Sequence, residues 1–417
     1  MQHLRVLLAI ETFLPLVGGS ERQAFLQGQY LRAQGIDASI MTMHFQQRWA
    51  VYEQLENVPV VRVGGRILAW HDRLPGVLRR LCYLCALLVF AWQLWQRRRE
   101  YDILHVFQLT LFTLPALLVC RLTHKPLVIG MRNDPAPSED ALPAQKRRSG
   151  KSWANLDGLQ RLGRPALLLI NRLLRDTHAH ILILSTQMRE SLQRAGLTGA
   201  QVLLIPNGVD PVRFYPAPER ATGNTTVVCV AKMRYQKGID ILLRAWRAVV
   251  ALAPEARLLL VGDGPLLTSL YQLAVELGIS ASVEFTGLCP DVVPQLQRGR
   301  ISVLPSRWEG MPNALLEAMA CGLACVATRV SGSEDLLAQE ACGLLVEPGD
   351  ANGLASAILR LLRNPDLARR YGQAARRSIE RSYVFGEVMY RHVELYATLV
   401  DNRSVRYVQE VIAQNTD

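Results

Sequence analysis

Short apolar runs alternate along the chain with longer stretches in which apolar residues recur every three or four positions. Apolar runs bounded by turn residues are typical of buried strands, and the longer spacing is typical of helices. This alternation predicts an α/β fold with parallel sheets. The predicted strands are residues 4–10, 37–42, 101–106, 126–130, 180–185 and 202–205, and then 226–231, 257–261, 282–286, 301–304, 324–327 and 343–346.

A segment rich in turn residues separates the two series of strands. The sequence IPNGVDPVRFYPAPER at 205–220 contains four prolines, as is typical of a linker between domains. We therefore predict two doubly wound domains, at 1–210 and 223–385, joined by a linker at 211–222. The remaining segment, 386–417, begins with an amphipathic helix at 386–400 that is able to pack on either domain.

The apolar stretch around residues 74–96 allows two interpretations. Its uncharged part, residues 81–95, is shorter than the ~20 residues needed to cross a bilayer, so we expect no spanning helix. The pattern fits a helix lying on a membrane surface and equally a helix buried in its domain. The residues that suggest the membrane are Arg79, Arg80 and Arg97–Arg99 at the two ends and Trp92 and Trp95 between them.

Composition excludes several classes of protein. With 417 residues, 50% of them hydrophobic and 20% charged, the chain is neither disordered nor a small disulfide scaffold. The eight cysteines are scattered, and Cys82 and Cys85 lack a second pair, so reduced and mostly buried thiols in a cytosolic protein are expected. Glu11 follows the first apolar run where a secretory signal would stay apolar.

The positive charge is concentrated in the first half of the chain. Residues 1–210 hold 25 basic and 15 acidic residues, which accounts for +10 of the total net charge of +11. This half is expected to meet a membrane surface, a phosphate-bearing substrate or a nucleic acid. Part of the charge falls in a proline-containing loop at 134–164, which we interpret as a basic lid.

The strongest chemical signal is the sequence EGMPNALLE at 309–317, which follows the predicted strand 301–304. Pro312 suits the first turn of a helix, which places Glu309 in the loop before the helix and Glu317 one turn inside it. The amides of Asn313, Ala314 and Leu315 then point outward and form an anion site. Two carboxylates for hydroxyl groups and amides for a diphosphate describe a nucleotide-sugar site. The alternative is a capped surface helix with two solvated acids.

Two further segments carry weaker signals. The sequence KMRYQKG at 232–238 follows the predicted strand 226–231, and cations at the carboxyl end of a parallel strand lie where α/β folds bind ligands. Lys232 and Lys237 would neutralise a diphosphate leaving group, unless this is an ordinary basic loop. Gly18 and Gly19 follow the first strand, where glycine lets the backbone approach a ligand and Ser20 is able to cap the next helix.

These residues together carry a family resemblance. The sequences GGSE (18–21), IPNGVD (205–210), KMRYQKGIDILLRAW (232–246), VGDGPL (261–266), FTG (285–287), PSRWEGMPNALLEAMACGLACVAT (305–328) and GLLVEPGD (343–350) resemble those of the family-four retaining glycosyltransferases, over essentially the whole chain. The resemblance implies a GT-B fold, in which two Rossmann-like doubly wound domains face each other across a cleft. It also implies that the C-terminal helix in 386–417 packs back toward the N-terminal domain.

The resemblance assigns roles to individual residues. It implies that Glu309 contacts the donor sugar, that Glu317 holds the ribose hydroxyls, and that Lys237, with Lys232, stabilises the departing diphosphate. It implies that Gly18 and Gly19 close over the donor. The full set of implied nucleotide-sugar-binding residues is Gly18, Gly19, Lys232, Lys237, Glu309, Gly310, Met311, Asn313, Ala314, Leu315 and Glu317.

The chain departs from the family pattern at two positions. Lys232 stands where the family usually has arginine, which keeps the charge and loses the bidentate fork. Phe107 stands where many members have a histidine near the donor sugar. His105 is interpreted as a structural histidine, and Arg132 offers another polar contact for donor or acceptor.

The expected reaction is retaining transfer of a hexose-type sugar to a glycan or lipid-linked saccharide in cell-surface polysaccharide assembly, with a UDP-sugar favoured over a GDP-sugar. No Asp-x-Asp pair occurs in the sequence, so we expect neither a metal nor another cofactor. The expected location is cytoplasmic, with peripheral contact at an anionic membrane. An epimerase or phosphorylase of the same fold is the alternative function.

Two other classes fit less well. An NAD-linked oxidoreductase would need a G-x-G-x-x-G sequence after its first strand, and none is present. A nucleic-acid-binding protein would use the positive charge, but no recognisable nucleic-acid-binding module occurs.

Overall fold

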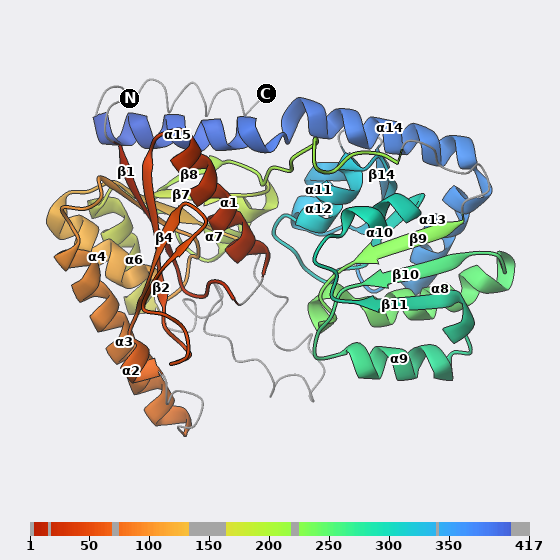
Figure 1. The fold of residues 1–417 in the computed structure, drawn as a ribbon, viewed down its shortest axis with the longest axis horizontal. Coiled ribbons are helices and arrows are strands. Elements are labelled where there is room, and N and C mark those ends of the chain that lie inside the picture. The colour runs from red at the N-terminus through yellow and green to blue at the C-terminus, as the bar shows by residue number, and fades with distance from the viewer. Residues whose placement is uncertain are drawn as a thin grey trace. The chain divides into compact units, whose positions relative to one another are not determined.

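The computed structural model describes residues 4–15, 18–68, 75–132, 164–217, 225–338 and 342–401. The chain forms two compact units, the first of residues 1–205 and 389–417, the second of residues 206–388. Each unit is an α/β domain built on its own parallel sheet (Figure 1). The expected fold of two Rossmann-like domains is thereby confirmed, whereas the basic loop expected at 134–164 lies, except for Arg164, outside the described residues.

The first unit contains an eight-stranded sheet in the order β3-β4-β2-β1-β5-β6-β7-β8. Every neighbouring pair is parallel except β3 and β4. The strands are β1 (Arg5–Ile10), β2 (Asp37–Met43), β3 (Tyr52–Leu55), β4 (Val58–Val63), β5 (Ile103–Val106), β6 (Leu127–Gly130), β7 (His180–Ile183) and β8 (Gln201–Leu204). The central strands are buried on both faces because helices cover both.

Helices flank this sheet on both sides. Figure 1 shows α3, α4 and α6 on one side and α1 on the other, and α4 packs against both α3 and α6. The helices are α1 (Gly19–Ala33), α2 (Gly65–Leu68), α3 (Gly76–Gln96), α4 (Thr113–Thr123), α6 (Arg164–Asp176) and α7 (Gln187–Arg194). The last helix, α15 (Phe385–Asp401), belongs to this unit from Met389 onward.

The hairpin of β3 and β4 was not predicted. Its two strands are short, and Pro59 within β4 argues against a strand in the sequence. Pro59 is tolerated because the parallel pairing of β4 with β2 begins one residue later, at Val60. Glu56, with φ of 50°, makes the turn between the two strands.

The second unit contains a parallel six-stranded sheet in the order β11-β10-β9-β12-β13-β14. Its strands are β9 (Thr226–Val230), β10 (Arg257–Val261), β11 (Val283–Gly287), β12 (Ile301–Leu304), β13 (Ala324–Thr328) and β14 (Gly343–Val346). All six lie within a residue or two of the predicted strands. An apolar run flanked by helical periodicity is a reliable local signal when both faces of the strand are buried.

The helices of the second unit connect and cover these strands. They are α8 (Ile239–Leu252), α9 (Leu267–Glu276), α10 (Val293–Arg298), α11 (Asn313–Ala320), α12 (Ser331–Ala338), α13 (Ala351–Arg363) and α14 (Pro365–Ser382), with short 3₁₀ turns at Tyr235–Lys237 and Ser280–Ser282. A single apolar core joins the sheet to α8, α9 and α13, and Trp246 lies fully buried within it.

The structure corrects the expected length of the apolar helix in the first unit. Residues Val77–Gln96 of α3 form a helical segment long and apolar enough to cross a membrane. The uncharged run 81–95 underestimated this length because the helix begins before Leu81 and includes Arg79 and Arg80. Length alone therefore no longer argues against a spanning helix.

Candidate functional site

The order of strands in the second sheet defines where a ligand would bind. From β9 the chain builds outward through β10 to β11, and from β12 it builds in the opposite direction through β13 to β14. Strands β9 and β12 therefore flank a topological switch point, where open α/β sheets bind ligands beyond the carboxyl ends of their strands. The two segments that leave the sheet there are residues 231–238 and 305–312.

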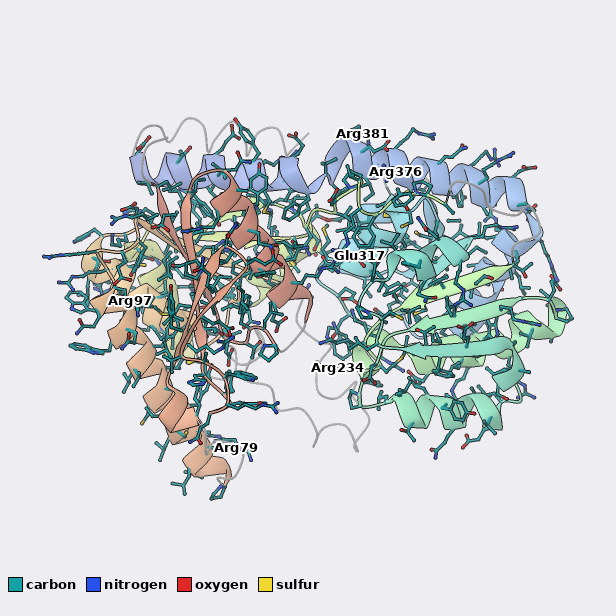
Figure 2. The ribbon with its side chains drawn as sticks, viewed as in Figure 1. Arg79, Arg97, Arg234, Glu317, Arg376 and Arg381 are labelled. Carbon is teal, nitrogen blue, oxygen red and sulfur yellow. The ribbon has the colours of Figure 1, made fainter. Side chains whose placement is uncertain are left out.

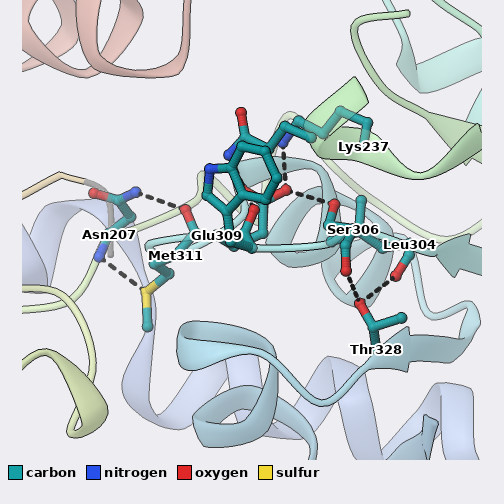
Figure 3. Close-up of polar contacts among 9 residues, drawn as sticks. Asn207, Lys237, Leu304, Ser306, Glu309, Met311 and Thr328 are labelled. Atoms are coloured by element: carbon teal, nitrogen blue, oxygen red, sulfur yellow. Dashed lines mark hydrogen bonds and ion pairs between the residues drawn. The ribbon is translucent and has the colours of Figure 1, made fainter. Parts of the chain in front are cut away.

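The two segments place Lys237 directly against Glu309 (Figure 3). The Lys237 ammonium donates to Oε1 of Glu309, which also accepts a hydrogen bond of 2.6 Å from the Ser306 hydroxyl. Glu309 is only 5% exposed. A buried carboxylate is expected to be paired and hydrogen-bonded, and both conditions are met. The geometry excludes a solvated surface acid at Glu309.

An ion pair beside this contact ties the same two segments together. Arg307 binds Asp240, at the start of α8, with two hydrogen bonds of 2.9 and 2.7 Å, and its guanidinium carbon lies 3.9 Å from the centre of the Tyr235 ring. The side chain of Gln236 donates to the Trp308 carbonyl at 3.0 Å. A bidentate arginine–carboxylate pair fixes orientation as well as distance, so the positions of the two loops are coupled.

Gly238 permits the close approach of the two loops. Its φ is 63°, and a Cβ at this position would clash with the carbonyl oxygen of Pro305. Glycine adopts positive φ without penalty and leaves room for the neighbouring backbone. The glycine after Lys237 is therefore part of the geometry that brings Lys237 to Glu309.

The start of α11 differs in two details from the expectation. Pro312 is the N-cap residue, with extended backbone, and the helix begins at Asn313. The Leu315 amide donates to the Pro312 carbonyl at 3.1 Å, so this amide is engaged within the first turn. The side chain of Asn207 donates to the Asn313 side chain at 2.9 Å and to the Met311 carbonyl at 3.3 Å. Asn207 thus secures the start of α11.

The remaining predicted residues of the second unit lie around this centre. Glu317 is one turn inside α11 and only 7% exposed, which again excludes a solvated surface acid. Met311 is buried, and the Gly310 carbonyl accepts a hydrogen bond of 2.7 Å from the Gly332 amide at the start of α12. Lys232 is exposed just after β9.

In the first unit, Gly18 and Gly19 lie at the start of α1. Gly18 is the N-cap residue and Gly19 the first helical residue. The proposed capping by Ser20 is wrong, because Ser20 lies inside the helix and the N-cap has no side-chain hydrogen bond. The Glu21 carboxylate instead folds back beside Gly18 and accepts a 2.7 Å hydrogen bond from Thr12.

His105 is buried among aromatic side chains. Its Nδ1 lies 2.5 Å from the Tyr396 hydroxyl, which accepts a hydrogen bond from Gln27, and its ring stacks on Phe107 with centroids 4.5 Å apart. Burial, together with the nearby Arg132, lowers the pKa of His105 well below the usual value, so the ring is neutral. These contacts agree with a structural histidine.

Arg132 lies over the Phe107 ring, with its guanidinium carbon 4.6 Å from the ring centre. Phe107 is itself fully buried. Burial lowers the pKa of Arg132 to about 10, which leaves the group positively charged at neutral pH. The aromatic residue that replaces the family histidine therefore serves as a platform for a cation.

Family comparisons agree with this geometry. The family model described as "Glycosyltransferase Family 4" matches residues 17–213, and the one described as "Glycosyl transferases group 1" matches residues 224–364. The chain belongs to the group 1 glycosyltransferases of family four.

Individual relatives of this glycosyltransferase are distant. A phosphatidylinositol N-acetylglucosaminyltransferase of Arabidopsis thaliana is 27% identical over 363 residues, covering 85% of this chain and 73% of that protein. UDP-Gal:α-D-GlcNAc-diphosphoundecaprenol α-1,3-galactosyltransferase of Escherichia coli is 31% identical over 174 residues, covering 39% of this chain and 45% of that protein.

Solved structures share the fold of this glycosyltransferase. Sucrose-phosphate synthase from Thermosynechococcus elongatus matches with a TM-score of 0.74 and 21% identity, covering 95% of this chain and all of that one. The Anabaena protein HepE, in complex with UDP-glucose, matches with a TM-score of 0.71 and 18% identity over the same shares. The fold is GT-B.

Several residues that build the glycosyltransferase's candidate site were not singled out from the sequence. Ser306, Arg307 and Asn207 lie within the quoted sequences 305–328 and 205–210, yet nothing local assigns them a partner. In the first unit, Glu11 directly follows β1 at the switch point between β1 and β5. Its Oε1 accepts a 2.9 Å hydrogen bond from Tyr83 of α3, and its Oε2 is buried without a hydrogen-bond partner.

A cavity of about 660 Å³ in the second unit lies elsewhere. It is lined by Arg300, Gly322 and Arg376, near the amino ends of β12 and β13, whereas the candidate site lies at the carboxyl ends. Arg300 and Arg376 donate there to carbonyls at the ends of α13 and α11. Within the described part of the chain, no three His, Cys, Asp or Glu side chains cluster as metal ligands.

Proposed function

We propose that this glycosyltransferase is a retaining hexosyltransferase that uses a nucleotide-sugar, with a UDP-sugar favoured over a GDP-sugar. The product is a glycan or a lipid-linked saccharide for cell-surface polysaccharide. The observation that carries the proposal is the meeting of Lys237 and Glu309 at the switch point of the second sheet. One group suits a diphosphate and the other suits sugar hydroxyls, and both lie where this fold binds ligands.

The donor would be held by complementary chemistry. Lys237, with Lys232, would neutralise the diphosphate, and the amides at the start of α11 (Asn313 and Ala314) would add partial positive charge. Carboxylates are acceptors only, so Glu309 would accept hydrogen bonds from the sugar and Glu317 from the ribose. Gly310, Met311 and Leu315 would form the backbone between these groups. Contact of Gly18 and Gly19 with the donor stays a prediction.

In the proposed reaction, the bond between the anomeric carbon and the diphosphate oxygen breaks while an acceptor oxygen bonds to the same carbon on the same face. The acceptor proton passes to the leaving diphosphate, so atoms and charge balance. Positive groups placed before the reaction stabilise the charge that develops on the leaving group. This transfer would proceed without a metal, and full activity in EDTA supports that statement, whereas a strict Mn²⁺ or Mg²⁺ requirement overturns it.

The relatives support the proposed substrate classes. The Escherichia coli relative is named for a UDP-sugar and a diphosphoundecaprenol acceptor, and the Arabidopsis relative for phosphatidylinositol. HepE binds UDP-glucose. We therefore favour an acceptor attached to an anionic lipid, and a protein that acts at the inner face of the cytoplasmic membrane. Arg132, a cation at the carboxyl end of β6, is our candidate for the acceptor's phosphate; His105, buried beside it, would act only by holding Phe107 in place.

The first test is a thermal-shift experiment with UDP, GDP, ADP and their sugars, without added metal. A ligand that binds only the folded protein raises the melting temperature, so a shift with UDP alone fixes the proposed base. Nuclear magnetic resonance of the product then separates the alternatives. A new α-linked saccharide from an α-linked donor shows retaining transfer, an altered free nucleotide-sugar shows an epimerase, and a sugar phosphate shows a phosphorylase.

A further inference from the structure

One face of α3 is an exposed apolar stripe. Six large apolar side chains along the helix are each at least half exposed: Val77, Leu78, Leu81, Leu84, Leu88 and Trp92. Residues 77, 81, 84, 88 and 92 follow the three-to-four spacing that places side chains on one side of a helix. Isolated exposed leucines are ordinary, but a contiguous patch of this kind marks an interaction surface.

The opposite face of α3 is part of the core of the first unit. Ala86, Leu87, Phe90 and Leu94 are buried, and the Phe90 ring packs on Phe112 with centroids 4.5 Å apart. If α3 crossed a bilayer, these side chains would have to leave the helix α4 and the sheet against which they pack. The helix is long enough to span, but its packing fixes it on the surface of the domain.

Polar contacts hold α3 in the same orientation. The Tyr83 hydroxyl donates to Glu11 at the end of β1, and the Cys82 thiol contacts the Ile67 carbonyl at 2.8 Å. Both of these α3 side chains are half-buried, whereas Leu84 and Leu88 are exposed. The stripe therefore faces outward on a helix whose rotation is fixed.

Basic residues accompany the stripe at both ends. Arg79 and Arg80 are exposed in the first turn, and Arg97, Arg98 and Arg99 follow the last. Figure 2 shows Arg79 and Arg97 at opposite ends of α3. Arg98 lies over the Trp95 ring, with its guanidinium carbon 4.7 Å from the centre. No acidic residue lies between Gly76 and Arg99.

We propose that α3 lies in the plane of an anionic membrane surface and inserts Leu81, Leu84, Leu88 and Trp92 among the lipids. Apolar side chains on one face with arginines at the ends match an interfacial helix, because the arginines meet anionic headgroups while the leucines leave water. A second copy of the chain would bury the stripe but would bring the two sets of arginines together. The inference extends the proposed function by naming the surface that binds, and its test needs no substrate.

The test is sedimentation of the full-length protein with vesicles of phosphatidylcholine, with or without phosphatidylglycerol. We expect binding to the anionic vesicles that weakens as salt is raised, since salt screens the headgroup charge. Leu84→Glu with Leu88→Glu should lower partitioning by about tenfold or more, because two apolar groups no longer enter the lipid. Arg79→Gln with Arg80→Gln should weaken binding to anionic vesicles and leave neutral vesicles unaffected.

The matched control carries the same change in the second unit. Val275 and Leu288 are 54% and 77% exposed, so Val275→Glu with Leu288→Glu adds equal negative charge to exposed apolar positions and should bind vesicles as the wild type does. A thermal melt confirms that each variant is folded. Equal binding by the Leu84/Leu88 variant overturns the proposal, as does loss of binding in both pairs of variants.

Two readouts separate the in-plane helix from other arrangements. Alkaline carbonate should release the protein from vesicles, and retention would show a spanning helix instead. The native Cys85 is exposed beside the stripe, so vesicles should slow its reaction with a charged maleimide, measured on the isolated peptide. A dimer in sedimentation velocity that the Leu84/Leu88 variant converts to a monomer, without any vesicle binding by the wild type, assigns the stripe to a second copy. Failure of the thermal-shift experiment with nucleotides leaves this result unaffected.

Discussion

Lys237 and Glu309 are 72 residues apart in the sequence and form an ion pair in the structure. Lys237 ends the segment after β9, and Glu309 lies in the segment after β12. The strands are neighbours in the sheet, so the segments begin side by side. A cation and an acceptor held together before substrate arrives need little rearrangement to serve a diphosphate and a sugar.

Replacing the Glu309 carboxylate should abolish most of the transfer. Glu309→Gln keeps the size of the side chain but weakens its acceptance of sugar hydroxyls, and we expect turnover to fall about a hundredfold or more. The measurement is the initial rate with a saturating donor, together with the thermal shift caused by nucleotide, which should persist. Normal turnover would remove Glu309 from the proposed mechanism.

Ser306→Ala should reduce turnover less than Glu309→Gln. The Ser306 hydroxyl donates to Glu309 over 2.6 Å, so its loss leaves a buried carboxylate with one hydrogen bond fewer, at a cost of about 1 kcal/mol in stability. Ser269→Ala is the control, because this exposed serine donates to the Leu266 carbonyl within its own helical turn. Equal effects of the two substitutions on turnover would contradict a role for Ser306 in positioning Glu309.

The pair Arg307–Asp240 should show measurable coupling in a double-mutant cycle. Its side chains are 16% and 34% exposed and bonded twice, so we expect a coupling free energy of about 1 kcal/mol. Arg369–Asp366 is a matched surface pair with side chains 71% and 85% exposed, for which the coupling should be near zero. Urea denaturation of Arg307→Ala, Asp240→Asn and the double variant supplies the numbers.

Gly238→Ala should destabilise the protein more than Gly278→Ala. Both glycines have positive φ, 63° and 70°, so both substitutions carry a backbone penalty of about 1 kcal/mol. Only at Gly238 would the new Cβ also clash with the Pro305 carbonyl, whereas Gly278 has open space around it. Equal melting temperatures for the two variants would show that the loops after β9 and β12 yield without cost.

Glu11→Gln should stabilise the protein increasingly as the pH rises. Burial raises the pKa of Glu11 above its ordinary value, and the Tyr83 hydrogen bond opposes this only in part. The native state therefore holds a proton that the unfolded state releases, so the wild type loses stability as the pH rises from the ordinary carboxyl pKa through the raised one. Glutamine resembles the protonated carboxyl and removes this loss. Thermal melts of both proteins across the range from acidic to neutral pH should diverge, and parallel curves would contradict the raised pKa.

The sequence by itself determined the elements of the fold and most of the candidate site. Buried parallel strands are continuous apolar runs, so every strand was predicted except β3 and β4, whose short pairing and Pro59 hide the local signal. Glu309, Lys237 and Glu317 were found because a helix start and the carboxyl ends of strands have local sequence signatures.

Only the tertiary structure decided which of these residues meet. The order of strands makes β9 and β12 neighbours, which brings Lys237 to Glu309 and leaves Ser306 and Arg307 to hold them; no local pattern encodes a contact across 72 residues. The two interpretations of α3 were likewise separated by packing, since a helix apolar on all sides does not reveal which face its domain covers. The domain covers Phe90 and Leu94 and leaves Leu84 and Leu88 exposed, because only one side of a helix can lie against a sheet.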